Sequence, residues 1–103
     1  MRRGELWWAD LPSPLGHRPA ILISRDQAIA VRTSVTLVPL TGRIRGIPVE
    51  VPLGPQDGVP RACVANADIV TTVLKSNLIR RIGRLAPDKL RAVEDALRFA
   101  LGL

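Results

Sequence analysis

Among its 103 residues, the sequence has one cysteine, one histidine, one phenylalanine, two tryptophans and no tyrosine. A single cysteine excludes an internal disulfide and favours a reducing compartment, so we expect a cytoplasmic protein. One cysteine and one histidine are too few for the usual zinc sites, and the nine acidic residues form no paired-carboxylate motif. Glycine-rich phosphate loops and dinucleotide-binding motifs are also missing. If the protein is an enzyme, we therefore expect it to work without a metal or an organic cofactor.

Long hydrophobic runs are absent too. No segment approaches the roughly 20 apolar residues that span a bilayer, so we expect no membrane partner. A chain of this length forms one domain, residues 1–103, with a single small core. Because 47% of the residues are hydrophobic, such a domain cannot easily bury all of them alone. This surplus predicts a homodimer.

Charge is unevenly divided, with a net charge of +6 at pH 7. The basic residues are 13 arginines and only two lysines, Lys75 and Lys89. Arginine grips phosphate with a planar fork of donors, which lysine lacks, so the composition favours a polyanionic partner. The same bias is also compatible with a GC-rich genome and with solubility.

Alternation and turn residues predict many short strands with one terminal helix. The expected strands cover residues 4–10, 19–24, 35–40, 47–53, 62–66, 69–74 and 80–85. Helical turns are expected at 26–31 and 75–78, and Pro87 suits the first turn of a final helix that ends at Gly102. This order predicts a mainly β fold, a small and strongly bent antiparallel sheet or barrel packed by a C-terminal helix.

Three periodic patterns assign faces within these elements. In the first strand, Trp7 and Trp8 alternate, which predicts one tryptophan in the core and the other half-exposed at a groove or interface. In residues 47–53 the odd positions are apolar and the even positions hold two prolines, which indicates an edge strand. The final helix has an apolar stripe formed by Leu90, Val93, Leu97, Ala100 and Leu101. Ala92, Ala96 and Phe99 widen it, so we expect this face to meet a partner.

The segment GHRPAILIS, residues 16–24, holds the first candidate site residue. Pro19 favours an extended conformation at Arg18, which places this arginine at the mouth of a strand. Thr41 falls at the end of the third expected strand. RNA can be cleaved by such groups when its own 2′-hydroxyl is the nucleophile, because the protein then only orients the phosphate and neutralises developing charge. A single arginine or threonine is also commonly a solvated surface residue.

Several ordered motifs resemble the MazF/PemK family of toxin endoribonucleases. They are RGELWWADLP, GHRPAILIS, VPLTG, GIPVEVPLG, CVANADIVTTVLKSNL, RRIGRL and ALRFALGL. The resemblance implies an SH3-like or CcdB-like fold that acts as a homodimer. It also implies metal-independent cleavage of single-stranded RNA, leaving a 2′,3′-cyclic phosphate and a 5′-hydroxyl, and a separate antitoxin with an acidic, partly disordered segment.

Carried over residue by residue, the resemblance makes Arg18 and Thr41 the catalytic pair. The expected RNA contacts are Trp7, His17, Arg43, Arg45, Lys75 and Ser76, the Lys75 region by its match to a family position. Two departures stand out: the first loop is short and lacks acidic residues that would pair with Arg18, and Gly42 replaces a common serine.

Two other functions remain open from the sequence. CcdB toxins, which resemble this family in fold, poison the protein gyrase, and a non-catalytic module would bind nucleic acid without cutting it. An arginine before a strand and a threonine at a strand end favour the ribonuclease.

Overall fold

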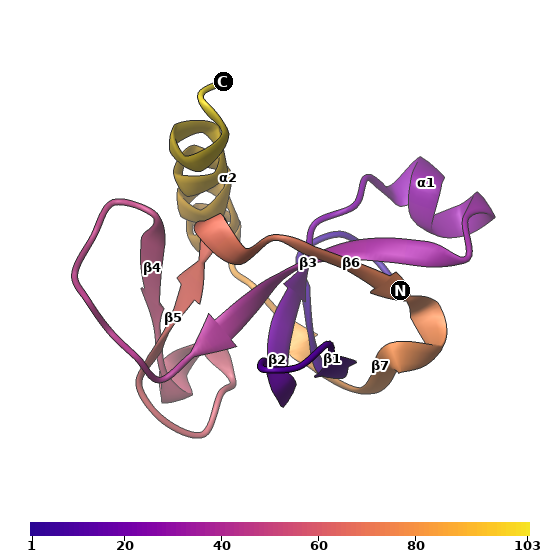
Figure 1. Ribbon diagram of the computed structural model, residues 1–103, viewed down its shortest axis with the longest axis horizontal. Helices are drawn as coiled ribbons and strands as arrows, with labels where there is room; N and C mark the ends of the chain where they lie inside the picture. The colour runs from indigo at the N-terminus through magenta and orange to yellow at the C-terminus, as the bar shows by residue number, and fades with distance from the viewer.

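Seven strands and two α-helices make up the structure, a computed structural model that describes residues 1–103 (Figure 1). The strands are β1 (Glu5–Leu11), β2 (Gly16–Leu22), β3 (Ser34–Thr41), β4 (Glu50–Leu53), β5 (Cys63–Asn66), β6 (Thr71–Leu74) and β7 (Leu78–Arg84). The helices are α1 (Asp26–Val31) and α2 (Pro87–Leu101). The predicted mainly β fold with a C-terminal helix is confirmed.

The strands form one antiparallel sheet in the order β4-β5-β3-β2-β1-β7, with β6 also paired to β3. The sheet does not close into a barrel, so of the two predicted forms the open, bent sheet is observed. Strand β4, which contains Pro52, lies at one edge, as the two prolines of the predicted strand 47–53 indicated.

Strand β3 bends the sheet because it changes partners along its length. Residues 34–37 pair with β6, whereas Leu40 and Thr41 pair with β5. Its other side pairs with β2 through Leu37, Val38 and Pro39. Because of this change of partner, Thr41 pairs with β5 and not with β6, and it lies next to the start of β2.

Two apolar clusters lie on the two faces of the bent sheet. The larger contains Leu6, Ile21 and Val38 and is closed by α2 through Val93, which is completely buried. The smaller contains Ala20, Leu22 and Leu37 and is closed by Ile29 of α1. In Figure 1 the two helices stand apart, α2 over the β4 and β5 half and α1 beside β6.

Strand β4 is shorter than predicted, starting at Glu50 instead of residue 47. The Glu50 carboxylate accepts hydrogen bonds from the backbone N–H groups of Arg45 and Gly46, at 2.9 and 2.8 Å, and so folds the preceding residues into a loop. Ile47, which was expected on the buried face, is consequently 38% exposed. Val49, Val51 and Leu53 are buried as expected.

Three further predictions needed correction. Strand β6 starts at Thr71 instead of residue 69, because Ala67–Ile69 forms a 3₁₀ turn in which the Asn66 side chain accepts the Asp68 N–H. Leu101 was expected in the buried stripe of the last helix but is 60% exposed. Neither tryptophan is fully buried, since both Trp7 and Trp8 keep intermediate exposure. Neither helix is long and apolar enough to cross a membrane.

Candidate active site

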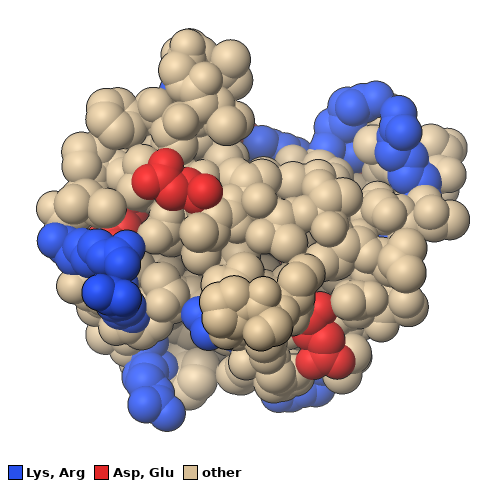
Figure 2. All heavy atoms as spheres, in the orientation of Figure 1, with Lys and Arg blue, Asp and Glu red and all other residues tan.

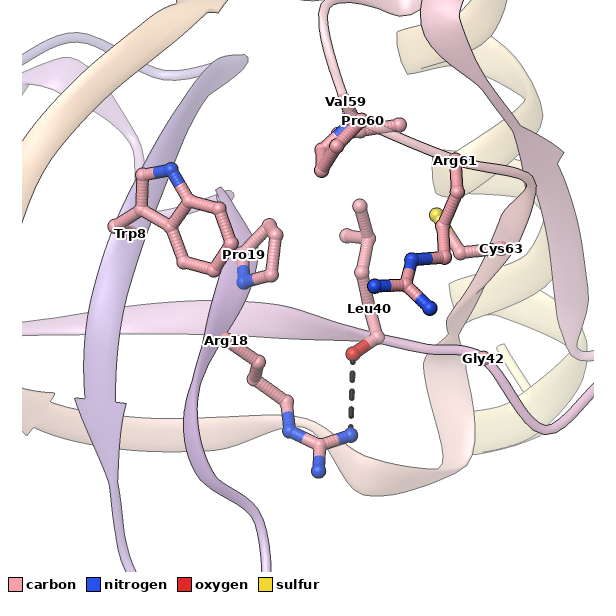
Figure 3. A pocket seen from close by; sticks show the side chains of 9 residues that line it. All are labelled: Trp8, Arg18, Pro19, Leu40, Gly42, Val59, Pro60, Arg61 and Cys63. Carbon is pink, nitrogen blue, oxygen red and sulfur yellow. Dashed lines mark hydrogen bonds between the residues drawn. The ribbon is translucent and has the colours of Figure 1, made fainter.

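A cavity of about 280 Å³ opens where the start of β2 meets the end of β3 (Figure 3). Its walls come from three parts of the chain: the β1–β2 hairpin, the end of β3, and the loop that precedes β5. The residues that line it are Trp8, Arg18, Pro19, Leu40, Gly42, Val59, Pro60, Arg61 and Cys63. Because the walls are far apart in sequence, the cavity exists only in the folded chain.

Arg18 enters the cavity region from β2, with its guanidinium held by two backbone carbonyls. Its Nε donates to the carbonyl of Leu15 at 2.6 Å and its Nη1 donates to the carbonyl of Leu40 at 3.2 Å. Figure 3 shows the second of these bonds. A guanidinium has five N–H donors, so three remain for a ligand. Arg18 belongs to none of the ion pairs, so backbone carbonyls and no carboxylate hold it.

Thr41 follows Leu40 directly, so the carbonyl that holds Arg18 also links it to this threonine. The Thr41 hydroxyl oxygen accepts the backbone N–H of Arg43 at 3.2 Å, which leaves the hydroxyl proton available to donate. Thr41 itself does not line the cavity, but both of its neighbours, Leu40 and Gly42, do. The two predicted catalytic residues thus belong to one local structure.

The loop after Thr41 carries Arg43 and Arg45 and is tied at both ends. The Thr41 hydroxyl holds its start and the Glu50 carboxylate holds its end. Burial works to raise the pKa of Glu50, but hydrogen bonds from Arg45, Gly46 and Ile47, together with the Arg45 charge, outweigh it and lower this pKa below its ordinary value. Both arginine side chains are exposed and belong to none of the ion pairs.

Trp8 is the tryptophan that lines the cavity. Its indole stacks on the imidazole of His17, with ring centroids 5.1 Å apart and planes 6° from parallel. The His17 Nδ1 hydrogen-bonds the Asp10 carboxylate at 2.9 Å, and the Asn77 side chain donates to the Asp10 carbonyl. Trp8 and His17 therefore form a fixed aromatic pair beside Arg18.

Arg61 and Cys63 are cavity residues that the sequence reasoning missed. The Arg61 guanidinium points toward Leu40, across the opening from Arg18 (Figure 3). Burial and the charge of Asp57 raise the pKa of the Cys63 thiol, which keeps it protonated and a poor nucleophile. The only sequence signal for Arg61 was its place between a turn and a strand, which many surface arginines share.

Three residues predicted to contact RNA lie away from the cavity. The Trp7 indole is on the other face of β1, where it packs against the smaller cluster and donates to Glu5 at 3.0 Å. The Lys75 ammonium donates to the carbonyl of Ile29 beside α1. Ser76 is exposed in the adjacent 3₁₀ turn. The structure brings together Arg18, Thr41 and His17, with the Arg43 and Arg45 loop beside them.

Positive charge is spread over several parts of the surface. Figure 2 shows Lys and Arg atoms at the left and lower edges and over α1 at the upper right, with Asp and Glu in fewer places. No acidic residue lines the cavity, whereas two arginines do. No three His, Cys, Asp or Glu side chains gather in a way that can hold a metal ion. The arrangement suits a ligand with an anionic group that accepts hydrogen bonds from the two arginines and a flat part that lies against Trp8.

Comparison with known families identifies this arrangement. Residues 2–101 match the model of the PemK-like, MazF-like toxins of type II toxin–antitoxin systems. The chain belongs to this toxin family. The Arg18 and Thr41 positions, first assigned from motif resemblance, therefore lie in a chain whose whole fold is that of the MazF-like toxins.

Relatives agree over nearly the full length. The Mycobacterium tuberculosis protein named probable endoribonuclease MazF5 is 40% identical over 100 residues, which cover 96% of this chain and 91% of that one. The structure of the Mycobacterium tuberculosis toxin MazF-mt6 superposes with a TM-score of 0.88 at 28% identity, covering 96% and 97% of the two chains. A mycobacterial endoribonuclease solved in complex with its cognate antitoxin also superposes with a TM-score of 0.88, at 31% identity, covering 100% and 96%.

Proposed function

We propose that this MazF-like toxin is an endoribonuclease that cleaves single-stranded RNA at short recognised sequences in the cytoplasm. The observation that carries the proposal is the Arg18 guanidinium, which is fixed by two carbonyls with three donors free, one of the carbonyls belonging to Leu40, the residue before Thr41. Relatives named endoribonucleases share the fold over nearly its full length. That likeness favours RNA cleavage over gyrase poisoning and over binding without cleavage.

In the proposed reaction, the 2′-hydroxyl of the RNA is the nucleophile. A proton leaves O2′, the O2′–P bond forms, and the P–O5′ bond breaks as O5′ gains a proton. The products are a 2′,3′-cyclic phosphate and a 5′-hydroxyl. The remaining donors of Arg18 bind the phosphorus oxygens, where negative charge grows in the transition state, and the Thr41 hydroxyl donates to the same group. A guanidinium has no acceptor atom, so Arg18 does not take the O2′ proton.

The chemistry requires only orientation and charge neutralisation from the protein, so it needs neither an organic cofactor nor a metal ligand set. His17, Arg43 and Arg45 stay in the proposal as RNA contacts because His17 precedes Arg18 in β2 and the two arginines are exposed on the loop that follows Thr41. For Lys75, Ser76 and Trp7 a contact with RNA requires a strand that extends well beyond the cavity. We also propose a homodimer. The proposed partner protein is a separate antitoxin, because a similar endoribonuclease was solved with its cognate antitoxin.

The test is digestion of total RNA by the purified protein, followed by mapping of the cut ends. Two results together support the mechanism: downstream fragments have 5′ ends that accept a phosphate from a kinase, and upstream fragments have 3′ ends that carry a cyclic phosphate. We expect Arg18→Ala to lower the cleavage rate about 10²–10³-fold, the usual cost of losing a charged transition-state donor. Thr41→Ala should act likewise, and Thr41→Ser should keep part of the activity because it keeps the hydroxyl.

Arg91→Ala is the matched control, since Arg91 is an exposed arginine on α2 that lines no cavity. Thermal unfolding of each variant separates catalysis from folding, because Arg18 also ties the first loop to β3. An Arg18→Ala protein that is folded and cuts RNA at the wild-type rate contradicts the assignment. Inhibition of gyrase supercoiling with no RNA cleavage supports the CcdB-like alternative.

A further inference from the structure

A second cavity, of about 470 Å³, adjoins the first and shares three of its walls: Trp8, Val59 and Pro60. Its other lining residues are Pro55, Gly58, Arg80, Arg81 and Ile82. The two cavities adjoin at the Trp8 side chain and along Val59 and Pro60, a segment called the ridge below. The two adjoining cavities together are called the groove.

The ridge between the cavities is a fixed part of the fold. Val59 is 3% exposed and belongs to the larger apolar cluster. The turn before it is closed by the Asp57 carboxylate, which accepts the Gly54 N–H at 3.0 Å, and by the Gly58 N–H donating to the Pro55 carbonyl. Gly58 has φ +99°, a conformation that favours glycine. A ligand in the groove therefore meets a rigid ridge.

The two arginines of the second cavity differ in their partners. The Arg81 Nε donates to the Glu5 carboxylate at 3.0 Å, so its charge is already balanced. Arg80 belongs to none of the ion pairs and is exposed. No acidic residue lines either cavity. Arg80 is therefore the available cation of the second cavity, as Arg18 and Arg61 are of the first.

Strand register fixes how the two cavities are placed on the sheet. Trp8 pairs with Pro19 on β2 and with Arg80 on β7, so the Cα atoms of Pro19 and Arg80 stand two strand spacings apart, about 10 Å. Because β1 lies between β2 and β7, the Trp8 indole shared by the two cavities has Arg18 on the neighbouring strand on one side and Arg80 on the other. Alternating cations and aromatic rings are how proteins hold the phosphates and bases of single-stranded nucleic acid.

We propose that the second cavity is a nucleotide subsite, in which Arg80 binds a backbone phosphate and Trp8 contacts a base of the RNA strand that is cut in the first cavity. This inference rests on the proposed ribonuclease function. It assigns Arg80 a role in substrate affinity and length dependence, and no role in the bond-breaking step.

The test compares a short RNA trimmed to the mapped cleavage sequence with RNAs extended on the 5′ side and on the 3′ side. We expect Arg80→Ala to lower kcat/KM about tenfold on one of the extended RNAs, through KM, and to leave cleavage of the short RNA unchanged. Losing one phosphate contact should also reduce the slope of log affinity against log salt concentration by about 0.7. Arg84→Ala, four residues along β7 and outside both cavities, is the matched control and should change neither value.

Binding measured in the Arg18→Ala background gives a readout that does not depend on cleavage. Fluorescence anisotropy of the extended RNA should show weaker binding when Arg80→Ala is added. If the wild-type protein neither binds nor cuts RNA, the proposed function fails and the subsite with it. If the protein cuts RNA but Arg80→Ala affects short and extended RNAs equally, or neither, the subsite alone is overturned. An effect of Arg80→Ala on antitoxin binding with none on RNA also overturns it.

Discussion

The buried carboxylate of Glu5 fixes the start of β1 through several hydrogen bonds. It accepts hydrogen bonds from the Arg2 N–H, the Trp7 indole and the Arg81 guanidinium. Burial alone would raise the pKa of Glu5, but these hydrogen bonds and the Arg81 charge outweigh it, and the pKa lies below its ordinary value. The carboxylate thus joins β1 to β7 next to the second cavity and balances the charge of Arg81.

We expect Glu5→Gln to lower the free energy of unfolding by about 1–3 kcal/mol at neutral pH, because it removes the charged acceptor of three hydrogen bonds. A carboxylate whose folded pKa is lowered stabilises the protein fully above its unfolded pKa, near 4.5. This stabilisation is lost as the pH falls through the folded pKa. The gap between wild type and Glu5→Gln should therefore shrink in acid.

Urea unfolding at neutral pH and below pH 4 measures this gap. Asp68→Asn is the control, since Asp68 is exposed and belongs to none of the ion pairs, and it should alter stability little at either pH. A gap of the same size at both pH values contradicts the assignment.

Single residues also show how far sequence reasoning reached. Pro19 restricts its neighbour locally, so an extended Arg18 was predictable, but β2 starts at Gly16 instead of residue 19, and Arg18 lies inside the strand and not at its mouth. Alternation correctly put Trp7 and Trp8 on opposite faces of β1. Which face holds the cavity depends on Val59 and Pro60, about fifty residues away, and no local pattern reports that. For this reason Trp8, and not the predicted Trp7, lines the groove.

At the scale of elements, α2 was predictable because its signals are local: Pro87 at its first turn, Gly102 at its end and an apolar stripe of helical period. The start of β4 was not, because it depends on the Glu50 carboxylate binding backbone N–H groups at Arg45 and Gly46. The 3₁₀ turn before β6 depends in the same way on the Asn66 side chain. Such side-chain hydrogen bonds to the backbone delay the start of a strand, although the alternation of apolar residues in the sequence still predicts the earlier start.

Helix α2 has an outer apolar end that its own core does not use. Val93 and Ala96 are buried, whereas Phe99, Leu101 and Leu103 are 64%, 60% and 86% exposed. Exposed apolar side chains gathered at one end of a helix are typical of an interface. A separate cavity between α2 and β4 is lined by Phe99 on the helix and by Pro52 on the strand.

We expect this end of α2 to contribute to the homodimer contact. Phe99→Asp should shift the protein from dimer to monomer, because it places a charge in an apolar contact, and should leave the fold of the single chain unchanged. Analytical ultracentrifugation measures the first effect and circular dichroism the second. Val31→Asp, a charge at a still more exposed apolar residue on α1, should leave the dimer intact. A wild-type chain that stays monomeric at micromolar concentration contradicts the prediction.

At the scale of the whole molecule, its net charge of +6 matters through a few cations that have no acidic partner. Arg18, Arg61 and Arg80 line the two cavities, and Arg43 and Arg45 project from the fixed loop beside them. An acidic, partly disordered antitoxin segment would be attracted to the same groove as RNA and would fold as it binds there. Such an inhibitor excludes the substrate by occupying its site.

The antitoxin should therefore compete with RNA, and salt should slow its association much more than it speeds its dissociation, because exposed charges mainly set the on-rate. Stopped-flow association at rising salt concentration measures this. Arg43→Glu with Arg45→Glu should slow association strongly, since both side chains are exposed on the loop that follows Gly42, a residue of the first cavity. Arg32→Glu, at the residue after α1, with Arg91→Glu on α2 changes the net charge by the same amount and should slow association far less. If the two pairs of substitutions slow association equally, net charge and not the groove guides the encounter. If the bound antitoxin leaves RNA binding unchanged, the antitoxin binds at another site.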